Sequence, residues 1–385
     1  FFAIRGTKIN ANRYIKEAIK KGATTVVSNL DFQGLKNKVL YIKTNNSRKA
    51  LSEIASKLYQ KKPKNLIAVT GTNGKSSIAD FYFQILKLNN KKVASIGTLG
   101  VKTHLNNLII NNTTLDPISL NQHLEKIKKL NIDNVILEAS SHGLKQNRLN
   151  GMDFKTGIFT NLSRDHLDYH KSYKDYLKSK LMLFRNLLKK NSNVITDIDI
   201  SQYKIIKNIT KKKQMKIFTI GSKKSYLELI KHHYKDHKQI FKIKYKNKIY
   251  KITVNLIGKI QIKNILMAMI AAEKSNIKFK KIVKSKNKIK NANGRFEKIG
   301  YLKNNSKIIL DYAHTPDALN NCLQNLHEQF INRKISIVFG CGGDRDKAKR
   351  AQMGKIVNKF CHKIYLTDDN PRFENPKKIR LAIKK

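Results

Sequence analysis

The sequence predicts an α/β fold with a mostly parallel sheet, and two observations support this class. Short apolar runs typical of strands alternate with segments whose apolar residues recur at helical spacing. Most of these runs also end in polar loops, as the strands of open parallel sheets do where they bind ligands. At 385 residues the chain exceeds one ordinary domain, so we expect two or three domains.

The first segment predicts a small α/β unit. Residues 12–21 have helical spacing and precede the strand-like run 23–29. A second helix is expected at 47–60, with Ser47 as its N-cap. The basic, proline-containing stretch KKPK that follows suits a domain boundary, so we predict a first domain at residues 1–62.

Two further domains are predicted from the strand-to-loop pattern. An apolar strand at 65–70 leads through a glycine turn into a helix at 78–88. More strands are expected at 134–140, 156–162, 193–196 and 248–258. A new series of strands running into polar loops begins near residue 294. We therefore predict a central domain at 63–293 and a C-terminal domain at 294–385.

The charge balance is strongly basic. Lys and Arg outnumber Asp and Glu by 79 to 26, a net charge of +53. Such a charge favours nucleic acid or an anionic membrane surface only where the basic residues cluster. Here the lysines are scattered along the whole chain, so solvated surface lysines are the favoured interpretation and no nucleic-acid partner is expected. The longest apolar run, residues 265–272, is far shorter than the roughly 20 residues of a membrane-spanning helix.

The cysteines indicate a reducing compartment. Their number is odd and their spacing is unpaired, so we expect a cytoplasmic protein without disulfides. They are Cys322, Cys341 and Cys361. The chain opens on FFAIRG, which reads as a strand already under way, and we expect the sequence to be a piece of a longer protein.

The stretch VTGTNGKSS at 69–77 predicts a phosphate-binding loop. Its two glycines allow backbone N–H groups to face a polyphosphate, Lys75 neutralises the charge, and the hydroxyl of Ser76 can bind Mg²⁺. A complete Walker A motif would have glycine where Val69 stands. The alternative is an ordinary glycine turn with an exposed lysine, which the preceding apolar strand makes less favoured.

Carboxylates and histidines follow the next strands. Glu138 ends the strand in ILEASSHGLKQNR, where a carboxylate can hold the Mg²⁺ that bridges the phosphates. Taken alone, Glu138 is more simply a solvated strand end. Two Asp and two His in NLSRDHLDYH at 161–170 suggest zinc by count, but their spacing fits no standard zinc pattern. A single histidine as second magnesium ligand or phosphate contact is the better interpretation.

Together these stretches resemble the Mur ligase family. Nine motifs occur in the family's order over nearly the whole chain: GTNGKSS, NTT, EASSHGLKQNR, NLSRDHLDYH, YLKSKLMLF, NGRFE, DYAHTPDAL, GCGGDRDKAKR and DDNPRFENP. The resemblance implies an N-terminal domain for a UDP-sugar, a central P-loop ATPase-like domain and a Rossmann-like C-terminal domain for an amino acid. It also implies that ATP phosphorylates a substrate carboxylate and that an amine attacks the resulting acyl phosphate.

Within the family, the motifs are most similar to those of members that add meso-2,6-diaminopimelate to UDP-N-acetylmuramoyl-L-alanyl-D-glutamate in peptidoglycan biosynthesis. The resemblance implies these two substrates, ATP as co-substrate and Mg²⁺ as cofactor, in a monomer with no membrane or nucleic-acid partner. Two alternatives within the fold are an L-lysine-adding relative and a ligase like folylpolyglutamate synthetase. A remote one is a basic nucleic-acid-binding protein, motivated by the charge alone.

The resemblance also assigns residues by position. ATP would be bound by Gly71, Thr72, Asn73, Gly74, Lys75, Ser76, Ser77, Asn264, Arg295, Asp311 and His314. The UDP-muramoyl-dipeptide would contact Asn112, Thr113, Thr114, Ser140, Gln146 and Arg148. The magnesium ligands would be Ser76, Glu138, His166 and, as a carbamate, Lys180. The catalytic residues would be Lys75, His166 and Lys180.

Several positions depart from the family pattern, and Thr196, Asp197, Ile198 and Asp199 stand where N-A-D-D usually follows a strand. Leu115 stands where proline usually follows the paired threonines, and Lys259 and Gln261 replace a usual arginine and asparagine. The family's G-K-G-H-E segment and the start of its UDP-sugar domain do not occur in the sequence, which again leads us to expect a piece lacking both ends.

One arginine stands out in TDDNPRFENP at 367–376. Asn370-Pro371 predicts a stiff turn after the strand KIYLT, because proline fixes its own φ and restricts the residue before it. The planar guanidinium of Arg372 can then bind a carboxylate through two parallel hydrogen bonds. The resemblance implies that this is the distal carboxylate of diaminopimelate, in a pocket that also includes Arg345, Asp369, Asn370 and Pro371. The alternative is a generic turn with a surface arginine.

Overall fold

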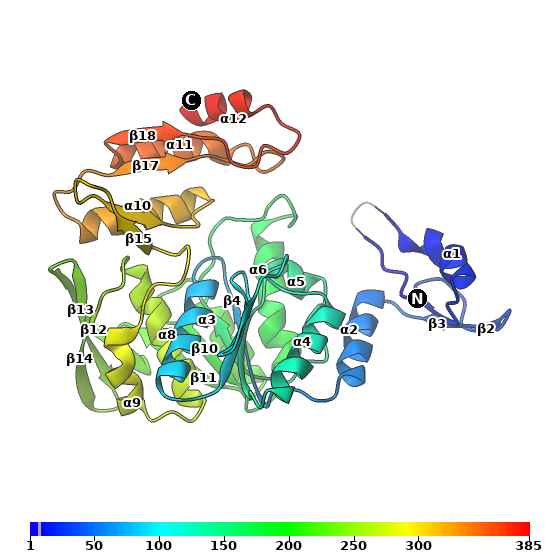
Figure 1. Cartoon of the computed structure of the whole chain (residues 1–385). Coiled ribbons are helices and arrows are strands. Elements are labelled where there is room, and N and C mark those ends of the chain that lie inside the picture. Colours follow the sequence, from blue (N-terminus) through cyan, green and yellow to red (C-terminus); the bar gives the residue numbers. More distant parts are fainter. Residues whose placement is uncertain (7–8) are drawn as a thin grey trace.

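The structure, a computed structural model, describes residues 1–6 and 9–385. Figure 1 shows a small N-terminal unit, a large central sheet covered by helices, and a C-terminal unit above one end of that sheet. The predicted domain limits fall in two connections. One lies between α2 (Ser47–Leu58) and β4 (Asn65–Thr70), and the other between η3 (Ser285–Lys288) and β15 (Glu297–Tyr301).

The N-terminal unit is a three-stranded sheet of order β1-β3-β2 packed against a short helix. Its elements are η1 (Ala11–Tyr14), α1 (Ile15–Lys20), β1 (Thr25–Ser28), β2 (Gly34–Lys36) and β3 (Val39–Lys43). The helix predicted at 12–21 is therefore a 3-10 turn followed by α1. Its small core comprises Ala3, Ile15, Val26 and Val39.

Helix α2 joins this unit to the central domain. Its N-cap is Asn46, whose side chain accepts a hydrogen bond from a backbone N–H of the first turn at 3.0 Å. The prediction that Ser47 is the cap was wrong, because Ser47 is already the first helical residue. The Ser52 hydroxyl donates to the Asn147 carbonyl at 2.6 Å, which ties α2 to the central domain.

The central sheet has eleven strands in the order β14-β13-β12-β11-β10-β9-β4-β8-β5-β6-β7. Besides β4, they are β5 (Val93–Gly97), β6 (Gly100–Lys102), β7 (Asn107–Leu108), β8 (Asn134–Glu138), β9 (Phe154–Phe159), β10 (Asn193–Asp197), β11 (Lys216–Gly221), β12 (Leu227–Lys235), β13 (Lys238–Tyr245) and β14 (Lys248–Val254). In the spatial order of the sheet, the strands β12, β11, β10, β9, β4, β8 and β5 pair in parallel. Antiparallel strands flank them at both edges, β13 and β14 at one edge and β6 and β7 at the other. The predicted mostly parallel α/β sheet is confirmed.

Within the central sheet, the sequence analysis missed β5 to β7 and β11 to β13. In β13, lysines alternate with buried side chains such as Phe241 and Ile243. One face of this edge hairpin is in water, so its sequence resembles a polar segment.

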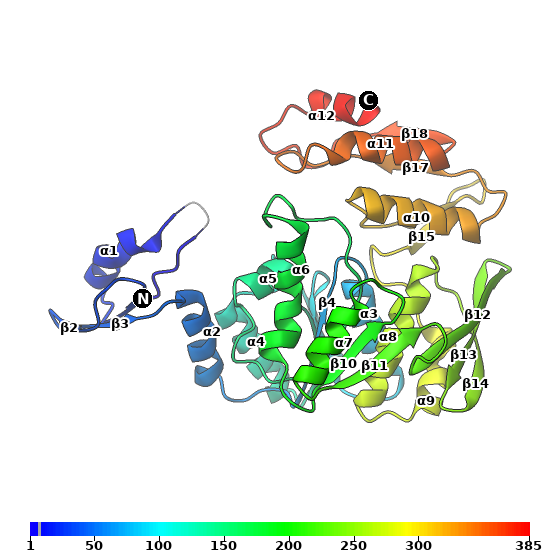
Figure 2. The ribbon, with the colours of Figure 1, turned by 180° about the vertical axis from the view of Figure 1, so that it is seen from behind.

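Helices cover both faces of the central sheet. One face carries α3 (Lys75–Leu88), α8 (Ile260–Lys274) and α9 (Phe279–Lys284), in front in Figure 1. The other carries α4 (Pro117–Lys129), α5 (Ser141–Lys145), α6 (Tyr173–Met182) and α7 (Tyr203–Lys212), which face the viewer in Figure 2. Residues 183–187 continue α6 as a π-helical turn. Alternate β4 residues enter the two apolar cores, as the period of a strand requires.

The C-terminal unit contains two short strand pairs and three helices. Strand β15 pairs antiparallel with β16 (Lys307–Leu310), and β17 (Ser336–Phe339) pairs in parallel with β18 (Lys363–Leu366). The helices are α10 (Pro316–Gln329), α11 (Lys349–Phe360) and α12 (Pro376–Lys384). The loops after β16, β17 and β18 carry the predicted amino-acid-binding and nucleotide-binding motifs toward the central domain.

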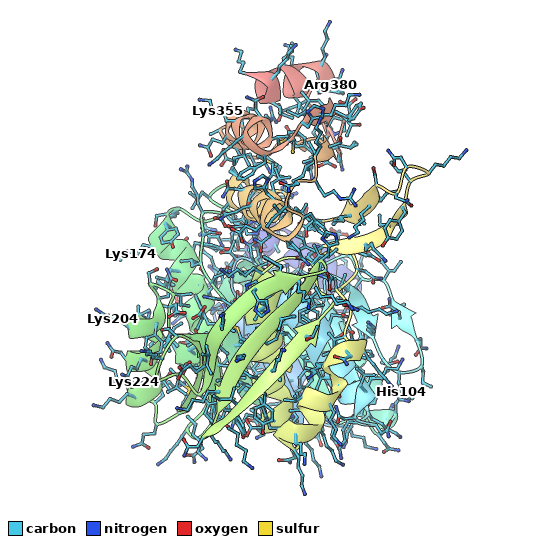
Figure 3. All side chains as sticks on the ribbon, turned by 90° about the vertical axis from the view of Figure 1, so that its left-hand side faces the viewer. His104, Lys174, Lys204, Lys224, Lys355 and Arg380 are labelled. Atoms are coloured by element: carbon cyan, nitrogen blue, oxygen red, sulfur yellow. The ribbon has the colours of Figure 1, made fainter. Side chains whose placement is uncertain are left out.

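The basic side chains are spread over the surface. The labelled residues in Figure 3, which include Lys174, Lys224 and Lys355, point outward from different parts of the chain. All three cysteines are free thiols, as predicted. Within the described residues, every helix is too short or too polar to cross a bilayer.

Candidate active site

The phosphate-binding loop connects β4 to α3. Gly71 and Gly74 have φ values of 146° and 90°, which favour glycine. A Cβ on Gly71 would lie 1.8 Å from the Thr160 hydroxyl, and one on Gly74 would lie 2.5 Å from Asn264 Oδ1. Helix α3 begins at Lys75 rather than at the predicted residue 78. The first helical turn therefore presents its free N–H groups at the loop, where a phosphate would bind.

Two lysines converge on one carbonyl of this loop. Lys75 Nζ donates to Gly71 O at 3.1 Å and to Thr72 O at 2.9 Å, while Lys180 Nζ donates to Gly71 O at 2.7 Å. Lys180 is 1% exposed. Burial and then the charge of Lys75 hold the pKa of Lys180 well below its ordinary value. Burial also lowers the pKa of Lys75. At most one of two such close amines is readily protonated, and Lys180 is the better candidate for a neutral amine.

The loop is clamped from β9, which the sequence analysis did not foresee. Asn161 Oδ1 accepts from Asn73 N at 2.9 Å, and the Thr160 hydroxyl donates to Asn73 O at 2.6 Å. The Thr72 hydroxyl accepts from Ser163 N at 3.0 Å. These contacts hold the loop open before any ligand binds. The only sequence feature that could have indicated these contacts was the position of TNLS at the end of a predicted strand.

Glu138 and His166, the predicted metal ligands, lie on two walls of the site. Glu138 is buried and its carboxylate accepts from the Thr98 backbone N–H at 2.9 Å. Gly97 leaves room for it, since a Cβ there would lie 2.3 Å from Glu138 Oε1. Burial lowers the pKa of His166 to about 4, so its imidazole is neutral and able to act as a ligand at neutral pH. Among the described residues, no three His, Cys, Asp or Glu side chains lie close enough together to hold a metal ion on their own. Mg²⁺ bound by Ser76, Glu138 and His166 would therefore need water and phosphate oxygens as further ligands, which this ion prefers.

Most residues predicted to contact the UDP-muramoyl-dipeptide form one hydrogen-bonded group. The Thr114 and Ser140 hydroxyls lie 3.0 Å apart. Arg148 donates to Thr114 O at 2.6 Å and to Gln146 Oε1 at 2.8 Å. Thr113 lies beside them, with its hydroxyl 3.1 Å from that of Thr98, whereas Asn112 is exposed on the preceding loop.

The departures from the family pattern occupy ordinary positions. Leu115 is buried in the apolar core of the central domain. Lys259 is the residue before α8. Gln261 accepts a hydrogen bond from Asn264 Nδ2 at 2.8 Å and so fixes the side chain that touches Gly74.

Three predicted nucleotide contacts come from the connection to the C-terminal unit. Arg295 donates to the Ser76 hydroxyl at 3.4 Å and stacks over the Tyr312 ring. Asp311 accepts from two backbone N–H groups, and burial raises its pKa. His314 lies at the wall of the cavity between the units. Arg295 thus reaches the phosphate-binding loop from outside the central domain, while Asp311 and His314 line the cavity between the units.

A cavity of about 810 Å³ lies between the central and C-terminal units. Its central wall is the turn at residues 164–168, and its opposite wall contains Arg345, Asp369, Asn370 and Arg372. Arg345 reaches across to Asp168, with 3.3 Å between Nη1 and Oδ2. The cavity adjoins the phosphate-binding loop through Asp317, which lines it and accepts a hydrogen bond from Asn73 Nδ2 at 3.3 Å.

The orientation of Arg372 has a different cause from the one predicted. Its φ of 51° is left-handed, and its N–H donates to Asn370 Oδ1 at 3.1 Å. Its guanidinium donates to Gly343 O at 2.6 Å. The backbone of Pro371 lies close to Gly343, where a Cβ would be 1.9 Å from Pro371 O. The proline thus restricts the turn, but an Asn side chain and a neighbouring loop orient the arginine.

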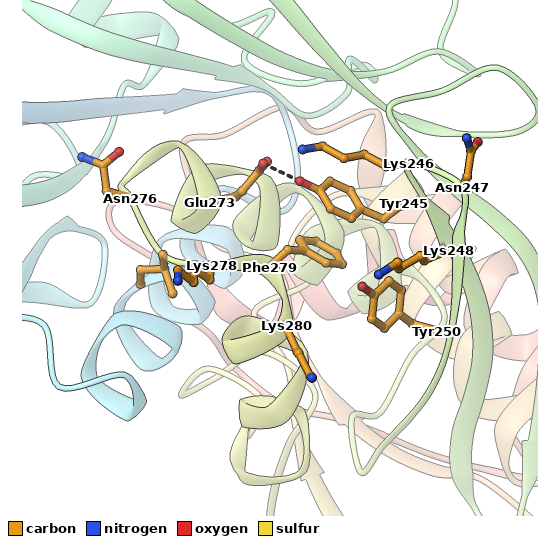
Figure 4. Close-up of a pocket in the computed structure, with 11 residues that line it drawn as sticks. Tyr245, Lys246, Asn247, Lys248, Tyr250, Glu273, Asn276, Lys278, Phe279 and Lys280 are labelled. Carbon is orange, nitrogen blue, oxygen red and sulfur yellow. Dashed lines mark hydrogen bonds between the residues drawn. The ribbon is translucent and has the colours of Figure 1, made fainter.

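A second pocket lies elsewhere, against the β13–β14 hairpin (Figure 4). It is open, about 690 Å³ in volume, and rimmed by the exposed lysines 246, 248, 278 and 280. Glu273 at its floor lies on α8, as does Asn264 of the predicted ATP-binding residues. The two are nine residues apart, or about 14 Å along the helix axis. The predicted site residues all lie outside this pocket.

A phosphate-binding loop facing a cavity that a second domain completes defines a nucleotide-dependent enzyme. Residues 69–272 match the Mur ligase middle domain, and residues 294–385 match the glutamate ligase domain of Mur ligases. The UDP-N-acetylmuramoyl-L-alanyl-D-glutamate--2,6-diaminopimelate ligase of Rickettsia montanensis is 40% identical over 388 residues, covering 100% of this chain and 80% of that protein. The chain therefore belongs to the Mur ligase family, whose members are ATP-dependent ligases.

Solved structures agree with this assignment. A structure of a UDP-N-acetylmuramoyl-L-alanyl-D-glutamate--2,6-diaminopimelate ligase has a TM-score of 0.74 and 31% identity, covering 97% of this chain and 76% of that one. The MurF ligase of Thermotoga maritima in complex with ADP has a TM-score of 0.66 at 15% identity, covering 96% of this chain and 85% of that one. The second likeness concerns the fold alone.

Proposed function

We propose that the chain adds meso-2,6-diaminopimelate to UDP-N-acetylmuramoyl-L-alanyl-D-glutamate in peptidoglycan biosynthesis, with hydrolysis of ATP to ADP and phosphate. The observation that carries this proposal is the cavity between the units, where Arg345, Asp369 and Arg372 lie opposite the turn at residues 164–168, which follows the Ser163 that contacts the phosphate-binding loop. The 40% identity to a ligase of that name over the whole chain supports it. Residues 1–62, 63–293 and 294–385 would serve as the UDP-sugar, ATP and amino-acid domains.

The loop would bind the triphosphate of ATP through backbone N–H groups at the start of α3. Lys75 would leave the Gly71 and Thr72 carbonyls, which it contacts at about 3 Å, and move onto the phosphates. Its charge would stabilise the transferring γ-phosphoryl group as a carboxylate oxygen of the dipeptide attacks phosphorus and ADP leaves. Asn264, Arg295, Asp311 and His314 would hold the nucleotide from the other side.

Ser76, Glu138, His166 and a carbamate on Lys180 would hold Mg²⁺, which would neutralise phosphate charge when bound. The carbamate would form as the neutral Lys180 amine attacks CO₂, making an N–C bond and releasing one proton. Burial and the neighbouring Lys75 hold the pKa of this amine well below its ordinary value, which favours the neutral form that such a reaction needs. The modification would turn a cation into an anion beside the metal.

The second half-reaction would need the amine close to the acyl phosphate and water kept out. The dipeptide would lie along Thr114, Ser140, Gln146 and Arg148, with its free carboxylate toward the phosphate-binding loop. The amine of diaminopimelate would attack the acyl carbon, and phosphate would leave as the amide forms. Closure of the C-terminal domain would exclude water from this intermediate.

The test is phosphate release by the purified chain with UDP-N-acetylmuramoyl-L-alanyl-D-glutamate, ATP and Mg²⁺, comparing meso-diaminopimelate with L-lysine. We expect release with diaminopimelate and little with lysine, which lacks the distal carboxylate for Arg372. Lys75→Ala should abolish release with both amino acids. Equal turnover with lysine would refute the amino-acid assignment and favour the lysine-adding alternative, while release unaffected by Lys75→Ala would refute the site.

A further inference from the structure

The cavity between the domains contains two arginine–aspartate combinations. Arg345 and Asp168 form an ion pair across the cavity, with 3.3 Å between Nη1 and Oδ2. Arg372 and Asp369 flank Gly342, since a Cβ there would lie 2.9 Å from Arg372 Nη1 and 3.4 Å from Asp369 Oδ2. An α-amino acid head carries a carboxylate and an ammonium group. Each combination therefore offers one partner for each charge of such a head.

Asp168 differs from four other carboxylates of this cavity in what it already binds. Asp165 accepts from His166 N, Asp311 from two backbone N–H groups, Asp317 from Asn73 and Asp346 from Ala348 N. The hydrogen-bond partner of Asp168 is Arg345, and the two side chains are 37% and 53% exposed. A half-exposed ion pair contributes little to stability, so it can separate to admit a zwitterion at small cost.

The position of Asp168 links it to the reacting end of the ligand. It lies in the turn that follows Ser163, whose N–H donates to Thr72 of the phosphate-binding loop at 3.0 Å. Arg372 and Asp369 lie on the opposite wall, in the C-terminal domain. A ligand with two amino-acid heads would thus place one head beside the acyl phosphate and the other against the C-terminal domain.

We propose that Asp168 binds the ammonium group of the reacting head of the incoming amino acid, while Arg345 takes the carboxylate of the same head. This inference rests on the proposed function and deepens it. Asp168 would orient the nucleophile from the domain that holds the acyl phosphate, and the Arg345–Asp168 pair would be the form that this subsite takes between substrates.

The test separates amine recognition from a simple contact between domains. Binding of meso-diaminopimelate and of 2-aminopimelate is measured by calorimetry, with the UDP-muramoyl-dipeptide and a non-hydrolysable ATP analogue present. The 2-aminopimelate keeps the distal head and the second carboxylate but lacks the reacting amine. Asp168→Asn should weaken binding of diaminopimelate about 10- to 100-fold and leave 2-aminopimelate within about twofold. Asp153→Asn, which removes a carboxylate paired with Lys155 and Lys189, is the matched control.

Three results would overturn the inference. If Asp168→Asn weakens both ligands equally, the residue acts only by holding the domains together. If it weakens neither, the ammonium binds elsewhere. If the unmodified chain binds no diaminopimelate and releases no phosphate, the proposed function fails and this inference with it. Asp168→Glu, which keeps the charge, should retain part of the preference for diaminopimelate over 2-aminopimelate.

Discussion

Lysines in two regions of the molecule differ in what surrounds their ammonium groups. At the phosphate-binding loop, Lys180 is buried and donates to the Gly71 carbonyl that Lys75 also contacts. At the pocket in Figure 4, Lys246, Lys280 and two further lysines are exposed to water. The first pair places its amines where water cannot solvate a positive charge well, and the second group does not.

This difference explains why the net charge is a poor guide to function here. A solvated lysine costs little, so it can accumulate on any surface. A buried ammonium without a carboxylate is unfavourable, and folding must compensate for it elsewhere. The pKa of Lys180 is accordingly displaced far downward, with burial as the main cause. Such a group marks a site better than any number of exposed cations.

The largest effect is expected where the contrast between buried and exposed lysines is tested directly. Lys180→Ala should lower phosphate release by about 10²-fold or more, because under the proposed function the site loses the carbamate that would complete the metal environment. Lys280→Ala, at the second pocket, should leave release unchanged. The parent chain should also lose activity in CO₂-depleted buffer and regain it with bicarbonate, since only a deprotonated amine forms a carbamate. An equal loss in both variants, or no response to bicarbonate, would contradict the contrast.

A smaller, ligand-specific effect is expected at the cavity. Arg372→Ala should raise KM for diaminopimelate about 10- to 100-fold, the usual effect of losing a charge-assisted, bidentate partner. KM for ATP should change by less than about twofold, because in the proposed site the nucleotide would bind against the central domain. Arg333→Ala, an exposed arginine of the same domain, is the matched control. Steady-state kinetics with each substrate varied in turn measures both constants, and an unchanged KM for diaminopimelate would refute the role of Arg372.

The sequence predicted the main features of the fold because strong patterns are local. The apolar run before GTNGKSS and the polar ends of later strands were enough to place the phosphate-binding loop and the parallel sheet. The clamp from Thr160 and Asn161 was not predictable, because it joins residues almost 90 positions apart. The partnership of Arg345 with Asp168 spans 177 positions and two domains. Short sequence patterns contain no information on such pairs.

Local errors had local causes. The Asn46 cap was missed because Ser47, the next residue, is an equally good N-cap type. Strand β13 was missed because its exposed face is rich in lysine. The left-handed φ of Arg372 was missed because a non-glycine residue rarely adopts it, and only the hydrogen bond from its N–H to Asn370 makes it explicable.

Arg350 is a third kind of cation, and removing the charge of its partner Glu374 should have the smallest effect of these predictions. Arg350 is buried like Lys180, but it pairs with Glu374 at 2.8 Å. This pairing holds the pKa of Glu374 at about 2, below the ordinary 4.5. Because the folded-state pKa is depressed, the pair stabilises the fold above about pH 4.5, and this contribution is lost as the pH falls through about 2.

Glu374→Gln should therefore lower the thermal midpoint modestly at neutral pH, and the difference from the parent chain should narrow between pH 4.5 and pH 2. Glu17→Gln removes the partner of exposed Lys21 in a pair of similar length and should change the midpoint little at any pH. Activity at neutral pH should persist in both variants, because a buried cation with a carboxylate partner is a structural element. If the difference in thermal midpoint stays constant with pH, Glu374 acts through packing. Its pairing with Arg350 would then not distinguish buried Arg350 from buried Lys180.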